Sequence, residues 1–142
     1  VTSEVEVKNA LDYGKKFFGG VNVVVNSAGI VAGAFPYDFE ARKAHPLDLY
    51  KKVMDVNVTG TFIVSSLAAG EMADNVLDEN QQRGLIINLA SIYGRDAPAY
   101  AFAYATSKAA VKGMTLPLAR CFGSKGIRVV TISPGYIETA LI

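Results

Sequence analysis

Three short runs rich in β-branched residues constrain the fold of this chain more than any other feature. They cover residues 21–26, 85–90 and 127–132, and they are almost entirely apolar. Runs of this kind are typical of strands that are buried on both faces in a parallel sheet. Longer stretches with helical periodicity alternate with them, at 3–18, 46–75 and 99–123. The alternation predicts an α/β fold in which a parallel sheet is joined by right-handed crossovers.

Other residues mark where the predicted helices begin or bend and where loops are expected. Ser3 and Glu6 have the spacing of a capping box, which predicts the start of the first helix. Residues 30–45 and 76–84 are polar or broken by glycine and proline, and we expect loops there. Pro117 predicts a kink in the third helix. Nothing in the pattern indicates a repeat or an interdomain linker, so the chain is predicted to form one unit.

Composition excludes several classes of protein. The 14 Lys and Arg residues are offset by 13 Asp and Glu, which argues against the basic footprint of a nucleic-acid-binding protein. A single cysteine, Cys121, excludes an intramolecular disulfide framework, and we expect it to pack inside the fold. His45 has no carboxylate or thiol pattern around it, so no metal site is expected. No uncharged apolar run approaches the roughly 18 residues of a membrane span, so none is predicted.

Small and polar residues follow each predicted strand. Asn26, Ser27, Ala28 and Gly29 come after the first strand. Ser91 comes after the second, and Ser133-Pro134-Gly135 comes after the third. The carboxyl ends of parallel strands meet at one edge of a sheet, where ligands bind in open α/β folds. These segments therefore predict a binding site at that edge.

The third helix contains a tyrosine and a lysine four positions apart. Tyr104 and Lys108 would face the same way, because residues i and i+4 share a helix face. A nearby ammonium favours phenolate and lowers the pKa of a tyrosine toward the range useful for acid–base chemistry. Ser91 can donate a hydrogen bond to a substrate carbonyl, and Asn57 can hold a water or orient the lysine. The spacing alone also fits a half-buried aromatic beside a solvated charge.

In combination, these residues resemble a known family. The order and spacing of Asn26 to Gly29, Asn57, Ser91, Tyr104 with Lys108, and Pro134-Gly135 are similar to the short-chain dehydrogenase/reductase family, and the similarity spans the chain. Residues 55–57, 69–72 and 113–117 resemble the mitochondrial members that act on 3-hydroxyacyl-CoA and on hydroxysteroids. The resemblance implies a Rossmann-like doubly wound parallel sheet and an NAD-dependent oxidoreductase that interconverts a secondary alcohol and a ketone.

The resemblance also implies catalytic roles. Tyr104 would be the general acid/base, and Lys108 would lower its pKa and hold the nicotinamide ribose. Ser91 would orient and polarise the substrate carbonyl, so Ser91 and Tyr104 would also bind the substrate. Asn57 would anchor a water-linked proton relay. The hydride chemistry would come from NAD itself.

Further cofactor contacts follow from the same resemblance. On the adenosine side it implies Val1, Asn26, Ser27, Ala28 and Gly29. Along the nicotinamide end it implies Pro134, Gly135, Ile137 and Thr139. Small residues at such positions let the backbone approach a ligand closely.

The same family pattern predicts that residues 1–142 form an incomplete NAD(P)-binding domain, without the N-terminal glycine-rich strand–turn–helix and the C-terminal substrate lid. We expect this chain on its own to fold poorly and to bind NAD weakly or not at all. By resemblance, the whole protein would be a homotetramer of the mitochondrial matrix. Two alternatives stay open: an NADPH-dependent 3-oxoacyl reductase, and a non-catalytic subunit of a mitochondrial tRNA-processing complex that meets nucleic acid only indirectly.

Overall fold

The computed structural model describes residues 1–138 and contains a parallel sheet of three strands. The strands are β1 (Val23–Asn26), β4 (Gly84–Leu89) and β5 (Ile127–Ile132), and they lie in the order β1-β4-β5. Both strand pairs are parallel, and Val24, Ile86 and Val129 align across them. The predicted α/β architecture is confirmed, with β1 beginning two residues later than expected.

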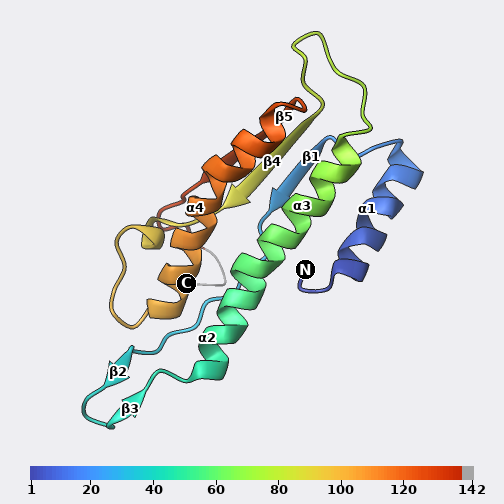
Figure 1. Ribbon diagram of the computed structural model, residues 1–142. Coiled ribbons are helices and arrows are strands. Elements are labelled where there is room, and N and C mark those ends of the chain that lie inside the picture. Colours follow the sequence, from blue (N-terminus) through green and yellow to red (C-terminus); the bar gives the residue numbers. More distant parts are fainter. Residues whose placement is uncertain (139–142) are drawn as a thin grey trace.

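The long helices all lie on one side of this sheet (Figure 1). They are α1 (Glu4–Phe18), α2 (Leu47–Met54), α3 (Gly60–Met72) and α4 (Phe102–Gly123). Helix α3 packs against β1 and β4, α4 packs against β4 and β5, and α1 packs against α3. The sheet therefore has one covered face.

Side-chain alternation along the strands separates the two faces of the sheet. Ile86, Ile127 and Val129 point toward the helices, where they are buried together with apolar residues of α1 and α3. On the opposite face, which we call the bare face, four aliphatic residues of the two outer strands are 40% to 56% exposed: Val23, Val25, Val130 and Ile132. Burial of apolar surface thus stabilises only one face of this sheet within the described residues.

The first helix begins and ends as its sequence predicts. The Ser3 side chain caps α1 by accepting a hydrogen bond from the Glu6 backbone N–H at 3.3 Å. Gly19 ends the helix in the left-handed region, with φ of +81°, and its N–H donates to the Lys15 carbonyl.

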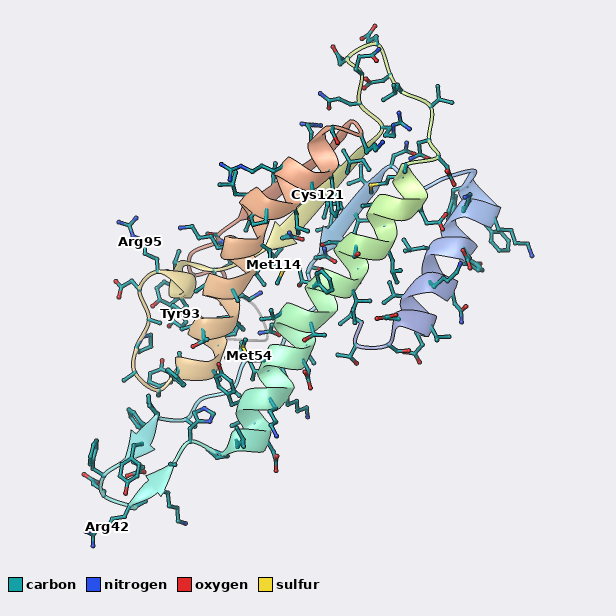
Figure 2. The ribbon with its side chains drawn as sticks, in the orientation of Figure 1. Arg42, Met54, Tyr93, Arg95, Met114 and Cys121 are labelled. Carbon is teal, nitrogen blue, oxygen red and sulfur yellow. The ribbon has the colours of Figure 1, made fainter. Side chains whose placement is uncertain are left out.

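The segment predicted as a loop at 30–45 contains a short hairpin instead. Strands β2 (Tyr37–Asp38) and β3 (Lys43–Ala44) pair antiparallel. The Asp38 carboxylate accepts hydrogen bonds from two backbone N–H groups of the turn. Arg42 follows with φ of +52° and lies at the tip, far from the sheet (Figure 2). The expectation of an irregular loop was therefore wrong at these residues, because the aspartate closes the turn locally.

The helix predicted at 46–75 covers residues 47–72 in the structure. Its centre is helical but not α-helical. A π-helical segment, η1 (Asp55–Thr59), separates α2 from α3. This combined helix, Leu47–Met72, is long and apolar enough to meet the criteria for a membrane span. Core helices of water-soluble proteins meet the same criteria, and Val53, Ile63 and Met72 are buried within this chain.

Helix α4 differs from the sequence prediction at its start and at Cys121. It begins at Phe102 rather than at residue 99, because residues 98–101 form a turn closed by the Ala101 N–H and the Pro98 carbonyl. The helix continues through Pro117 without interruption. Cys121 is exposed rather than packed (Figure 2), because its neighbours Leu118 and Phe122 occupy the face of α4 that meets the core.

Candidate active site

The carboxyl edge of the sheet brings the end of β1 against two helices. Ser27, Ala28 and Gly29 are exposed there. A β-carbon built on Gly29 would lie 3.4 Å from Asn57 Oδ1 and 3.6 Å from Lys108 Nζ. The backbone at Gly29 thus runs beside both polar groups, and three segments predicted as parts of one site meet at this point.

Asn57, in the π-helical segment, holds the chain that leaves β1. Its Oδ1 accepts a hydrogen bond from the Ile30 N–H at 2.8 Å, and its Nδ2 donates to the Ile30 carbonyl at 2.9 Å. The same Nδ2 donates to Ser107 Oγ at 2.9 Å. The asparagine is 1% exposed, so these bonds satisfy a buried amide and a main-chain unit that has left the sheet.

Ser107 extends this network into α4. Its hydroxyl donates to the Tyr104 carbonyl at 2.7 Å while it accepts from Asn57, and the side chain is fully buried. We call Asn57, Ile30 and Ser107 the amide network. It fixes the π-helical segment, the β1 exit and the helix turn of Tyr104 relative to one another. Single π-helical turns often occur at functional sites.

Lys108 is a buried cation next to this network. Its side chain is 6% exposed, and burial lowers the pKa of its amine below the usual value. The Nζ atom donates to the Leu89 carbonyl at 2.7 Å, its one acceptor within residues 1–138. An ammonium carries three donors, so two are free for hydroxyl groups of a ligand. The same Nζ lies 5.6 Å from the centre of the Tyr104 ring.

Ser91 follows the end of β4 by two residues. It caps a 3₁₀ turn, η2 (Ile92–Gly94), by accepting a hydrogen bond from the Tyr93 N–H at 3.1 Å. The serine hydroxyl proton is therefore free to donate outward. Gly94 fits directly against α4, because a β-carbon there would lie 2.9 Å from Ala109 N and from the Lys108 carbonyl carbon. This close approach holds η2, which Ser91 caps, against the part of α4 that carries Lys108.

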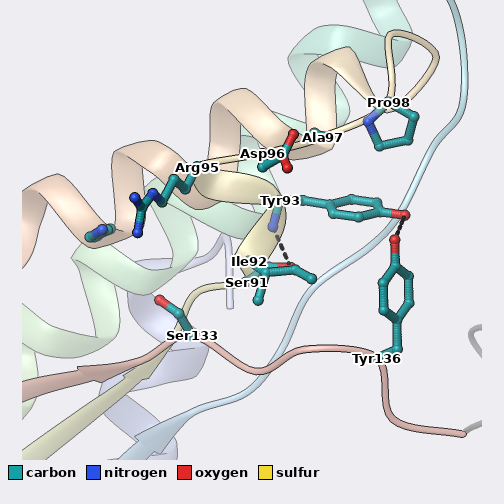
Figure 3. Close-up of a pocket in the computed structure, with 10 residues that line it drawn as sticks. Ser91, Ile92, Tyr93, Arg95, Asp96, Ala97, Pro98, Ser133 and Tyr136 are labelled. Carbon is teal, nitrogen blue, oxygen red and sulfur yellow. Dashed lines mark hydrogen bonds between the residues drawn. The ribbon is translucent and has the colours of Figure 1, made fainter.

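A cleft of about 650 Å³ opens beside Ser91 (Figure 3). We call it the serine cleft. Its lining includes Ser91, Tyr93, Arg95, Ser133 and Tyr136. Tyr104 is not among the lining residues, but its ring meets the Tyr93 ring edge-on with centroids 6.1 Å apart. The cleft therefore adjoins the tyrosine–lysine pair instead of enclosing it.

Other predicted contacts fall at different places. The Asn26 side chain is buried within the fold, where Nδ2 donates to Ser65 Oγ at 3.0 Å and to Asn88 Oδ1 at 2.8 Å. Only its backbone neighbours reach the open edge. Val1 packs against the first residue of α3, since a β-carbon on Gly60 would lie 2.6 Å from Val1 Cγ2.

The third strand end lies against the second. The Pro134 carbonyl accepts a hydrogen bond from the Ile92 N–H at 3.0 Å, and Gly135 and Ile137 are exposed beyond it. Thr139 lies outside the described residues. Most of the predicted edge is thus assembled around Tyr104, Lys108 and Ser91.

Sequence reasoning missed several members of this site. Ser107 lies three positions after Tyr104, and because residues i and i+3 share a helix face, this spacing was a signal that could have found it. The Ile30 main chain carries no side-chain signal. Tyr93 and Tyr136 become neighbours only through the fold, with their hydroxyl oxygens 3.2 Å apart.

Comparison with known proteins gives one consistent result. A family model described as short chain dehydrogenase matches residues 1–142. A 3-hydroxyacyl-CoA dehydrogenase type-2 from Mus musculus is 45% identical over the whole chain, and the match covers 54% of that protein. The chain thus spans about half the length of the curated relatives it matches.

Solved structures give the same picture. A 3-hydroxyacyl-CoA dehydrogenase type-2 from Mycobacterium avium superposes with a TM-score of 0.92 at 31% identity, over 99% of this chain and 55% of that one. An NAD⁺-bound xylitol dehydrogenase has a TM-score of 0.81 at 34% identity, over 98% of this chain and 49% of that one. An NADPH-bound ElxO variant has a TM-score of 0.82 at 29% identity, over 98% and 52%.

Proposed function

The chain belongs to the short-chain dehydrogenase family, and we propose that the protein is an NAD-dependent oxidoreductase that interconverts a secondary alcohol and a ketone. The proposed substrates are 3-hydroxyacyl-CoA and 3-oxoacyl-CoA, with hydroxysteroids as further ones. One observation carries the proposal: Lys108 is buried beside Tyr104 at the open edge of the sheet and keeps two donors free. The name of the 45% identical relative supports the substrate class.

We also propose that residues 1–142 are part of a larger Rossmann-like domain. The bare face supports this, because four aliphatic side chains at 40% to 56% exposure form a surface that a further layer would cover. The coverage of 54% of the mouse relative is consistent with it. In this proposal the glycine-rich turn and the substrate lid belong to other parts of the domain, and the whole protein is a mitochondrial homotetramer.

The residues at the edge fit a nicotinamide cofactor. The exposed backbone at Gly29 runs beside Asn57 and Lys108, and Lys108 keeps donors for ribose hydroxyls. In this proposal Ser27, Ala28, Pro134, Gly135 and Ile137 complete the contact through exposed backbone and small side chains. The bound cofactor would supply hydride transfer, which protein side chains cannot.

Tyr104 and Lys108 would manage the proton. During oxidation the Tyr104 phenolate takes the proton of the substrate hydroxyl, and during reduction the phenol returns it. The Lys108 cation stabilises the phenolate form of Tyr104 by its positive charge. Ser91 donates a hydrogen bond to the same substrate oxygen and holds it toward Tyr104.

Asn57 would anchor the water-linked proton relay that the family resemblance implies. Its side-chain amide is committed to Ile30 and Ser107, so its contribution is to hold the turn beside Lys108 in position. The orientation of a catalytic group is worth a large part of a rate enhancement, because misplacement by about 1 Å is costly.

The test is a direct assay of the full-length protein. We expect 3-hydroxybutyryl-CoA to reduce NAD⁺, followed through the absorbance of the reduced nicotinamide, with acetoacetyl-CoA as product. Simple secondary alcohols without the thioester serve as the comparison. Absence of turnover with every secondary alcohol, in the presence of either nicotinamide cofactor, would overturn the proposed function.

The NADPH-dependent reductase is a second candidate, favoured by the NADPH-bound ElxO neighbour. Titration of the full-length protein with NADH and with NADPH, monitored by fluorescence of the reduced nicotinamide, separates the two. Tighter binding of NADPH would replace NAD in this proposal and leave the roles of Tyr104 and Lys108 unchanged.

A further inference from the structure

The serine cleft has one wall made of two tyrosines. Tyr93 extends from η2, and Tyr136 rises to meet it from the segment after β5 (Figure 3). Their hydroxyl oxygens are 3.2 Å apart, and their ring centroids are 6.0 Å apart at 83°. We call Tyr93 and Tyr136 the phenol pair. Neither takes part in the proton chemistry proposed above.

Several contacts set the position of Tyr93. Its N–H donates to Ser91 Oγ, and its ring lies edge-on against Tyr104. The neighbouring Ile92 N–H donates to the Pro134 carbonyl, which ties η2 to the segment that carries Tyr136. The phenol pair therefore lines the same cleft as Ser91, and its Tyr93 ring contacts the Tyr104 ring.

The phenol pair has more hydrogen-bond donors than the bond between its two hydroxyls uses. Each phenol has one O–H donor, so the pair has two protons. The mutual bond uses one of them, and the other is free to donate. The hydrogen bond shared with Tyr136 raises the pKa of the Tyr93 phenol above its ordinary value. The wall of the cleft thus offers a donor to an acceptor that lies inside it.

We infer that the phenol pair is a specificity determinant that selects substrates with a second carbonyl near the reacting carbon, the 3-oxoacyl thioester class, over ketones with an apolar remainder. The inference rests on the proposed function and narrows it. Ser91 and Tyr104 hold the reacting oxygen, while the pair donates to the thioester carbonyl two carbons away. A steroid ketone lacks that acceptor and leaves the donor unpaired, which binding sites built for hydrogen bonds reject.

The experiment uses the full-length protein and two ketones of equal chain length. One is the acetoacetyl thioester of N-acetylcysteamine, and the other is an unbranched methyl ketone. The double variant Tyr93→Phe/Tyr136→Phe keeps both rings and removes both hydroxyls. We expect the ratio of kcat/KM for the thioester over the methyl ketone to fall about tenfold in the double variant.

The single variants Tyr93→Phe and Tyr136→Phe should each lower that ratio about two- to threefold, because the remaining phenol can still donate. Tyr13→Phe, on an exposed tyrosine of α1, is the matched control and should leave the ratio unchanged. If the bond between the two phenols had only a structural role, removing it would lower the melting temperature and would lower the activity on both ketones equally.

The outcomes are separable. A ratio within twofold of the wild type in the double variant, with both ketones still reduced, overturns this inference alone. A wild-type protein that reduces neither ketone with NADH or NADPH overturns it together with the proposed function.

Discussion

Tyr104 is flanked by two structures that lie at the same sheet edge but are built differently. On one side, the amide network of Asn57, Ile30 and Ser107 is buried, and its hydrogen bonds of 2.7–2.9 Å join three segments of the chain. On the other side, the serine cleft is open, and Tyr136 is 73% exposed.

The difference separates two tasks. A buried, fully bonded network holds groups in fixed positions, as proton transfer requires. An open wall of side chains that keeps a donor free can respond to the shape and polarity of a ligand. We therefore expect changes on the buried side to affect rate and stability for every substrate. Changes on the open side should affect one substrate relative to another.

The largest effect is expected at Tyr104, between the two sides. Tyr104→Phe keeps the ring but removes the proton-transferring hydroxyl, so kcat/KM should fall by about 10²–10⁴-fold. Cofactor binding, measured by fluorescence titration of the full-length protein, should persist. Retention of more than a tenth of wild-type turnover would contradict the acid/base role.

The next effect tests the buried side directly. Asn57→Ala leaves the Ile30 N–H and carbonyl without their partners, which should lower the free energy of unfolding by about 2–4 kcal/mol. Urea denaturation of the full-length protein measures it. Asn80→Ala, at an exposed asparagine in a loop, is the control and should change stability by less than about 0.5 kcal/mol. Equal effects at the two sites would show that the amide network does not stabilise the fold.

A smaller loss is expected where the open side meets α4. Gly94→Ala brings a methyl group within 2.9 Å of main-chain atoms of α4, which cannot yield as a flexible side chain would. Overpacking of this kind costs about 1–3 kcal/mol, and the displaced Ser91 should lower kcat as well. Gly123→Ala meets nothing within 4 Å and should be neutral or stabilising by up to about 1 kcal/mol. A Gly94→Ala protein as stable and active as the wild type would show that Ser91 is positioned by other contacts.

The smallest effect concerns the charge of Lys108. Burial lowers the pKa of its amine in the folded protein. At a pH between that lowered pKa and the ordinary lysine value, the unfolded chain therefore holds a proton that the folded chain has lost. Stability from this group must therefore rise with pH through that window, by at most about 1.4 kcal/mol per pH unit.

The measurement compares unfolding free energies of wild type and Lys108→Met from neutral to alkaline pH, so that other titrating groups cancel. As the pH rises, the unfolding free energy of the wild type should increase relative to that of the variant by about 1 kcal/mol or less. A difference that is flat, or that moves the opposite way, would show that the ammonium is not desolvated in the folded protein.

Sequence alone was sufficient for the features that depend on local pattern. The β-branched runs predicted all three parallel strands, and the i, i+4 spacing placed Tyr104 and Lys108 on one side of α4. The parallel topology then placed Gly29, Ser91 and Pro134 near one edge without any contact having been seen.

Features that depend on distant contacts were not predictable in this way. The π-helical segment is held by Asn57 bonding to Ile30, 27 residues earlier. The hydroxyls of Tyr93 and Tyr136 meet across 43 residues. Cys121 is apolar enough to be buried, but only the packing of its neighbours on α4 decides which side of the helix faces water.

The π-helical segment gives the long helix one residue more than a regular α-helix would need. Its five residues, Asp55–Thr59, close a turn that is one residue wider than an α-turn. Each residue of an α-helix turns the chain by about 100°, so the wider turn takes up the extra residue while α3 keeps its direction relative to α2. Deleting one residue at this turn should therefore restore an α-helix and leave Ile63 and Met72 in the core. The same deletion near the start of α3 would rotate the rest of that helix by about 100° and turn both side chains away from the core.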